Sequence, residues 1–304
     1  MREGENRFAE LLAEDDAYLL SSRAVLRVRG DAGRAALQGL ITNELSTDGR
    51  AATYGVVVDH EGRVTGDLFV VPDEDDLLVD CDRSQAATWL ERIRANAAGP
   101  SDVTDETARW RVFGLLNNQS LFDDGTPYIR YADPRRHELG SRVLRPVESR
   151  ESLSWRHEGK WRAHAYRLGV ATTEVFGRVR LNPYEAGLHA LSALAPARLA
   201  ALGLAPLEIG PGQAARRLLP FRVEPSGPGL PAMVGEPVVG GQTPVGQVIA
   251  IQSLFGLALM DLEPWRAALA RGDLLRCAGE QVLVAWPTWL GRESTGRATP
   301  AARE

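Results

Sequence analysis

The chain has 304 residues, 44% of them hydrophobic and 25% charged, an ordinary globular composition with enough length for two or three domains. Its net charge of -5 argues against a surface that binds nucleic acid or anionic membranes through general positive charge. The two cysteines, Cys81 and Cys277, have no CxxC spacing, which argues against a disulfide framework or a structural zinc site.

The opening of the chain is acidic and amphipathic, and it lacks the cationic start and apolar run of a secretory signal. Nowhere does an apolar run approach the ~18 residues that span a bilayer. We therefore expect a cytoplasmic protein with no membrane partner and no direct nucleic-acid partner. Phe8–Leu20 has the pattern of a short helix or a helix followed by a strand.

A strand, a helix and a hairpin follow. Ala24–Arg29 alternates as a strand does, and Asp31 can cap a helix over Ala32–Leu40. The apolar runs Tyr54–Val58 and Val64–Val71 then read as a hairpin, because β-branched valines favour strands and the glycine-containing turn between them favours reversal.

Asp67 is the unusual residue of this hairpin, since it is a carboxylate in a mostly apolar strand. A buried carboxylate must be hydrogen-bonded or paired to stay ionised. The ordinary interpretation is a strand residue on the solvent face, and strand alternation alone leaves both interpretations open.

The next elements predict α+β layering, with no nucleotide-binding GxGxxG or P-loop motif. They are a strand at Leu77–Val79, a helix at Arg83–Ala97, and short strands at Val103, Trp110–Leu116 and Tyr128–Tyr131. After a polar link at Pro146–Gly159, we expect a helix at Lys160–Ala171, an extended segment at Gly177–Leu181, a turn at Asn182–Leu188 and a helix at Pro196–Leu204.

From about residue 213 short apolar runs alternate with Gly- and Pro-rich turns, which predicts a separate β-barrel or sandwich over 213–290. The tail 291–304 is polar, and we expect it to be disordered.

Few groups in the sequence suggest chemistry. The five histidines have no metal-ligand spacing, so we expect no metal, and no nucleophile elbow is present. Cys81 lies between two aspartates, which raise a thiol's pKa and so disfavour a nucleophile. Carboxylates in pocket-like contexts remain: Asp67, Glu138 and Glu185.

Four segments in order carry a resemblance. They are LQGLITNELS (37–46), YGVVVDHEGRVTGDLFV (54–70), AYRLGVATTEVFG (165–177) and NPYEAGL (182–188). Together they resemble the folate-binding superfamily of the glycine-cleavage T-protein and its YgfZ-like relatives. The resemblance implies an α+β fold with two interleaved α+β lobes around a central folate-type pocket, plus a C-terminal β-barrel. The first lobe would comprise 1–50 and 140–212, and the second 51–139.

The resemblance also implies site residues. Asp67 falls on the catalytic aspartate of the T-protein, Tyr54 on a tyrosine that lines the folate site, and Glu138 on a glutamate that binds the pterin ring. Tetrahydrofolate or a derivative would be the cofactor. The YgfZ-like cysteine motif KGCYxGQE is absent, because the corresponding stretch Ala205–Gly212 contains no cysteine.

Three functions follow from the resemblance. The first is a folate-binding YgfZ-like accessory protein that maintains iron–sulfur enzymes, with iron–sulfur proteins as partners, and by that route supports tRNA modification. The second is a tetrahydrofolate-dependent aminomethyltransferase or demethylase that uses Asp67, which would make the chain an enzyme. The third is an interaction scaffold that has lost folate. Fold likeness alone does not decide among them.

Overall fold

The computed structural model describes residues 17–46, 51–99, 102–116, 125–148, 155–204 and 214–291. Three sequence predictions fall outside these ranges in whole or in large part: the helix beginning at Phe8, the stretch 205–212 and the tail 291–304.

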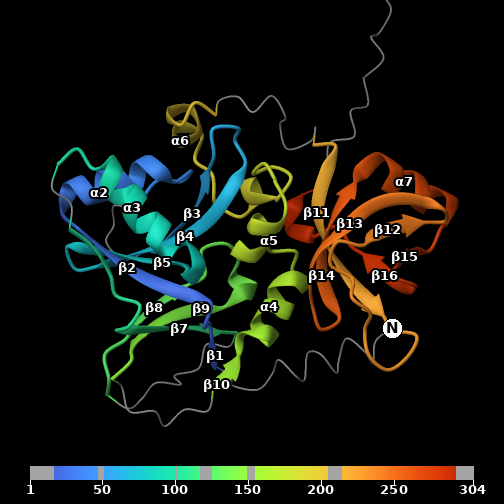
Figure 1. The fold of residues 1–304 in the computed structure, drawn as a ribbon, viewed down its shortest axis with the longest axis horizontal. Coiled ribbons are helices and arrows are strands. Elements are labelled where there is room, and N and C mark those ends of the chain that lie inside the picture. Colours follow the sequence, from blue (N-terminus) through green and yellow to red (C-terminus); the bar gives the residue numbers. More distant parts are fainter. Residues whose placement is uncertain are drawn as a thin grey trace, which may run out of the picture.

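The first sheet is antiparallel throughout, with strand order β3-β4-β5-β2-β6. Helices α2 (Gly30–Leu40) and α3 (Ala86–Asn96) lie on one face of it, where their apolar side chains pack against those of the strands (Figure 1). The strands are β2 (Arg23–Arg29), β3 (Thr53–Val58), β4 (Val64–Asp73), β5 (Asp76–Asp82) and β6 (Asp102–Asp105).

The second sheet has the order β10-β1-β7-β9-β8. Its β1 pairs antiparallel with β7 and parallel with β10, so the start of the described chain is joined to its middle. The strands are β1 (Ala17–Leu19), β7 (Trp110–Leu115), β8 (Ile129–Ala132), β9 (Ser141–Pro146) and β10 (Trp155–His157).

One hydrophobic core joins the two sheets. It contains Tyr54 and Phe69 of the first sheet, Leu144 of the second and Trp161 of the helix that follows β10. Strand alternation explains this, because residues at every second position of a strand share a face. The face of the first sheet away from α2 and α3 is therefore buried against the rest of the fold.

Short helices connect the sheets to the last domain. The longest, α4 (Glu158–Arg167), contacts strands β11, β13 and β14 of that domain (Figure 1). The others are α5 (Thr173–Arg178), η3 (Leu188–Ala190) and α6 (Pro196–Ala201), whereas η1 (Arg83–Gln85) follows β5 and η2 (His137–Leu139) precedes β9.

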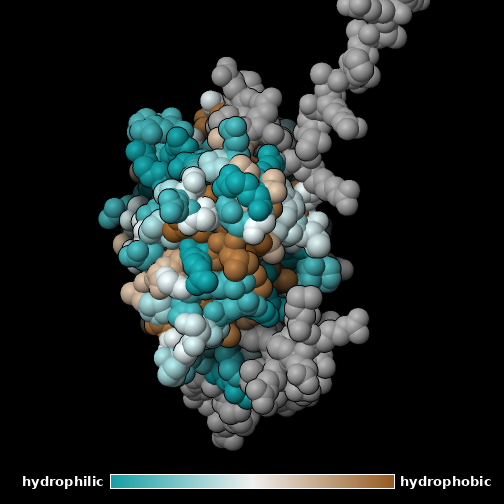
Figure 2. Space-filling model, turned by 90° about the vertical axis from the view of Figure 1, so that its right-hand side faces the viewer, coloured by the Kyte–Doolittle hydropathy of each residue, from teal (hydrophilic) through white to brown (hydrophobic). Residues whose placement is uncertain are grey.

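The last domain is a closed six-stranded barrel of order β11-β14-β13-β12-β15-β16. The large apolar side chains that are exposed among the described residues all belong to this region, and apolar atoms are visible on that side of the molecule in Figure 2. Its elements are β11 (Arg216–Glu224), β12 (Pro237–Gly240), β13 (Thr243–Gln252), β14 (Phe255–Asp261), α7 (Leu262–Arg271), β15 (Leu275–Cys277), β16 (Glu280–Val284) and η4 (Thr288–Leu290).

The structure confirms the predicted α+β class with a C-terminal barrel, and it confirms the hairpin, whose turn has Gly62 at φ 72°. Asp31 does not cap α2, because the helix begins one residue earlier and Asp31 lies in its first turn. Within the described residues, no helix is long and apolar enough to cross a membrane.

Two further points differ from the sequence predictions. The segment expected to be extended from Gly177 begins inside a helix, α5 (Thr173–Arg178). Strand β9 was not predicted, because the arginines at 142 and 145 interrupt its apolar pattern. The division of the chain into two lobes stays a prediction.

Candidate functional site

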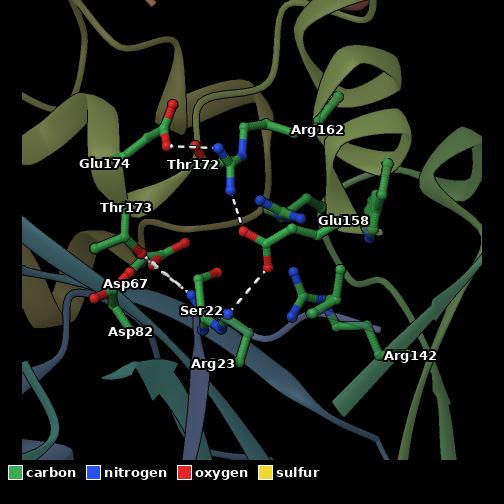
Figure 3. Close-up of a pocket in the computed structure, with 14 residues that line it drawn as sticks. Ser22, Arg23, Asp67, Asp82, Arg142, Glu158, Arg162, Thr172, Thr173 and Glu174 are labelled. Atoms are coloured by element: carbon green, nitrogen blue, oxygen red, sulfur yellow. Dashed lines mark hydrogen bonds and ion pairs between the residues drawn. The ribbon is translucent and has the colours of Figure 1, made fainter. Parts of the chain in front are cut away.

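A pocket lies where the two sheets meet helices α4 and α5. Its lining comes from β2, β4 and β9 and from both helices, and includes Asp67, Arg23, Arg142 and Thr173 (Figure 3). The lining includes four arginines and four acidic residues, so the positive and negative charges of the pocket wall are equal in number.

Asp67 lies at the base of this pocket, on the face of β4 that is turned toward the second sheet. It is opposite Val56 in the hairpin and only 1% exposed, so the solvent-face interpretation is wrong. Its Oδ1 accepts a hydrogen bond from the Thr173 hydroxyl and lies 3.4 Å from Nη1 of Arg23. Both of these contacts are made by Oδ1.

The Asp67 carboxyl is ionised despite its burial. Burial alone raises a carboxyl pKa, but the positive charges of Arg23 and Arg135 and the hydrogen bond from Thr173 outweigh it. The pKa of Asp67 is therefore held below its ordinary value, and the group is a hydrogen-bond acceptor at neutral pH.

Tyr54 lies beside Asp67 but is entirely within the core. It pairs with Phe69 across the hairpin, with ring centroids 4.9 Å apart, and Arg135 lies over its ring. Its hydroxyl is buried and has no hydrogen-bond partner among the described residues. Burial, and then the nearby Asp67 carboxylate, raise the pKa of Tyr54, so the phenol stays protonated.

Glu138 lies apart from these two residues. It is on η2, its side chain is 33% exposed, and its Oε2 accepts a hydrogen bond of 3.0 Å from Nε of Arg136. It does not line the pocket. Its backbone carbonyl, 2.7 Å from Nε2 of His164, makes the contact that ties η2 to α4. The structure thus brings together two of the three predicted site residues.

A network of buried ion pairs, missed in the sequence, surrounds the base of the pocket. Asp80 on β5 is its central carboxylate. Asp80 accepts hydrogen bonds from Nε of Arg23 at 2.6 Å, from Nη1 of Arg142 at 2.7 Å and from the hydroxyl of Tyr131 at 3.0 Å. Because Arg23 is on the first sheet and Arg142 on the second, Asp80 joins the sheets electrostatically.

A second carboxylate, Asp133, continues the network. It accepts two hydrogen bonds from Arg135, from Nε at 2.9 Å and from Nη2 at 2.8 Å, which form a bidentate pair. It also accepts one from Nε of Arg142 at 3.3 Å. Burial would raise the pKa of Asp133, but Arg135 outweighs burial and lowers it. Every arginine at the base of the pocket is therefore already paired with an aspartate.

Three charged side chains, each only partly buried, lie at the mouth of the pocket. Arg162 bridges Glu158 and Glu174 of α4 and α5, its Nη1 lying 3.1 Å from Oε2 of Glu174 (Figure 3). Glu158 also accepts the backbone N–H of Ser22 at 3.0 Å. These bonds hold α4 and α5 to the edge of β2.

The space over the base of the pocket does not fit a pterin. The pocket encloses about 70 Å³, and the rest of the depression is open to solvent. A cavity that binds the single ring of benzene measures about 150 Å³, whereas a pterin has two fused rings. The Arg142 guanidinium covers the Phe69 ring at 3.8 Å. The Asp67 carboxylate would suit a pterin, but the enclosed volume of the pocket is too small to bury one.

No metal centre is formed by the described part of the chain, which has no cluster of three or more histidine, cysteine or acidic side chains able to hold an ion. Both cysteines are buried, and burial raises the pKa of Cys81 to about 12 and that of Cys277 to about 11. Neither offers a thiolate at neutral pH.

The fold is similar to that of the glycine cleavage system aminomethyltransferase T from Bartonella henselae, with a TM-score of 0.61 and 12% identity over 95% of this chain and 89% of that one. At this identity the likeness shows the fold alone.

Two sequence matches are more specific. Residues 216–292 match the family model described as "CAF17, C-terminal beta-barrel domain". The chain is also 26% identical over 204 residues to a mitochondrial iron–sulfur cluster assembly factor IBA57 homolog of Pyricularia oryzae. That match covers 58% of this chain and 48% of the relative, so the chain spans about half the length of the curated relative it matches. The chain therefore has the fold of a glycine-cleavage T-protein, and its C-terminal barrel is similar to that of the CAF17 family.

Proposed function

We propose that this chain is an accessory protein of iron–sulfur cluster assembly, with iron–sulfur proteins as its partners. The match to the assembly factor of Pyricularia oryzae carries this proposal, and the CAF17 barrel supports it. An effect on tRNA modification belongs to the same proposal, as a consequence for enzymes that depend on such clusters.

The state of the cysteines supports an accessory role over a cluster carrier. Cluster ligation requires thiolates, and both thiols of this chain are buried with raised pKa values. The chain would therefore act on its partners through protein contacts.

Reduced folate was the expected ligand, and the geometry does not favour it. The pocket presents the Asp67 carboxylate, but its enclosed part, about 70 Å³, is too small to bury a pterin. An aminomethyltransferase or demethylase would need that folate, so no observation favours this second function. We accordingly propose the accessory role without a resident folate.

Two measurements test the proposal. Deletion of the gene from its host is expected to lower the activity of a [4Fe–4S] dehydratase, with no change in a dehydrogenase that lacks a cluster. The wild-type gene restores the activity, and Asp67→Asn, which keeps the fold, restores it equally. Unchanged dehydratase activity in the deletion strain would refute the accessory role.

The folate question is decided separately by calorimetry. Titration of 5-formyltetrahydrofolate to millimolar concentration into the purified chain is expected to give no saturable heat. Saturable heat in the wild type that is weaker in Asp67→Asn would instead support a folate-binding accessory protein or a folate-dependent transferase. This result does not depend on the outcome in the deletion strain.

A further inference from the structure

The Phe69 ring, buried beneath the arginines that line the pocket, is surrounded by guanidinium groups. The Cζ atoms of Arg142, Arg135 and Arg23 lie 3.8, 4.9 and 5.4 Å from the ring centroid. Cations within about 6 Å of an aromatic centroid are attracted to its face. Arg142 is by far the nearest, and its distance is that of direct contact.

The surroundings of Arg142 are those of a bound planar cation. One aromatic ring, Phe69, contacts its guanidinium, and a second, Trp161, lies 5.6 Å away. Two carboxylates accept hydrogen bonds from different sides of the group, Asp80 Oδ2 from Nη1 at 2.7 Å and Asp133 Oδ2 from Nε at 3.3 Å. Arg142 is 5% exposed, so these contacts replace water.

These contacts come from separate parts of the chain. Phe69 is on β4, Asp80 on β5, Asp133 follows β8, and Trp161 is on α4. Each carboxylate also has its own second arginine, Arg23 for Asp80 and Arg135 for Asp133. The site around Arg142 would therefore keep its shape and its carboxylates if the guanidinium were removed.

We propose that Arg142 is a built-in ligand, which fills an aromatic and acidic site for a planar cation at the place where this fold has its central pocket. The chemical class of the ligand is a guanidinium ion. The side chain closes the pocket to larger planar molecules and joins the sheets, and a free guanidinium compound will bind when the side chain is absent.

Lysine cannot serve in the same way. Its ammonium is a compact charge that cannot lie flat on Phe69 while donating to carboxylates on two sides, as the planar guanidinium does. The variant Arg142→Lys therefore keeps the positive charge of the side chain but loses its planar shape, so the effects of charge and shape can be measured separately.

The test uses the purified full chain and the variant Arg142→Ala. Methylguanidinium chloride at low millimolar concentration is expected to raise the Tm of Arg142→Ala by several degrees in a saturable manner, and to leave the wild-type Tm unchanged. Sodium chloride at equal ionic strength is the salt control. Arg162→Ala is the matched control, because Arg162 pairs with Glu174 at the open mouth and its side chain is 25% exposed.

Each outcome is informative. Folded Arg142→Ala with no saturable rise, or an equal rise in Arg162→Ala, overturns the proposal. Should Arg142→Ala fail to fold, Arg142→Lys keeps the charge between Asp80 and Asp133 and decides the matter. A Tm several degrees below wild type supports the planar site, and a Tm equal to wild type overturns it.

Discussion

Asp80 joins the two sheets, and its replacement by asparagine isolates the contribution of that charge. The carboxylate is fully buried and accepts from Arg23 at 2.6 Å, Arg142 at 2.7 Å and Tyr131 at 3.0 Å. Asparagine keeps the shape but carries no charge and offers one oxygen only. One of the two guanidinium groups would then face an NH₂ donor.

The expected cost follows from the partners that remain. Removing one member of a buried ion pair typically costs about 3–5 kcal/mol. Arg23 retains Asp67 at 3.4 Å and Arg142 retains Asp133 at 3.3 Å, so we expect the lower end, about 3 kcal/mol. With an unfolding entropy of about 2.1 cal/mol/K per residue over 304 residues, that corresponds to a fall in Tm of about 5 °C.

Thermal unfolding followed by circular dichroism measures the change, with a urea titration for the free energy of unfolding. Asp102→Asn is the matched control in the same sheet, because Asp102 pairs with Arg29 at 3.0 Å while 59% exposed. Surface pairs of this kind contribute about 0–1 kcal/mol. A Tm of Asp80→Asn within about 2 °C of wild type would refute the electrostatic account of the sheet junction.

Three further results are expected. Tyr54→Phe removes a buried hydroxyl without a described partner, so unfolding free energy should stay equal or rise by up to about 1 kcal/mol, and a clear loss would reveal a partner. Cys81 and Cys277 should react with a thiol reagent only after unfolding, since both are buried; fast reaction of the native chain would contradict their placement. Because Asp67 and Asp133 have lowered pKa values when folded, the stability they contribute should be complete above about pH 5 and be lost as the pH falls below about 4. A Tm measured from pH 7 to 3 should fall less steeply in Asp67→Asn, and an identical slope would count against the lowered pKa.

The sequence predicts the elements whose information is local. The β3–β4 hairpin could be found from its valines and Gly62, and the barrel from its repeated short apolar runs. The inward orientation of Asp67 also follows from alternation once Phe69 is known to be buried, because the two residues share a face.

The ion-pair network could not be predicted in this way. Asp80 and Arg142 are 62 residues apart, and Arg23 and Thr173 are 150 apart. An arginine in a strand resembles a surface residue, so the buried strand β9, with arginines at 142 and 145, was not predicted. These partners meet only in the folded chain, and the hydrophobic pattern of the strands that carry them does not indicate the pairing.

The parallel pairing of β1 with β10 has a consequence for the order in which the chain can fold during synthesis. Strands β2 to β6 are complete once residue 105 has emerged, whereas the second sheet waits for residues 155–157. Until then, β1 has a bare edge, which is a site for mispairing. The barrel strands all lie within 216–284, so their partners emerge close together in time. Among the described strands, β1 therefore waits longest after its own synthesis for its last partner.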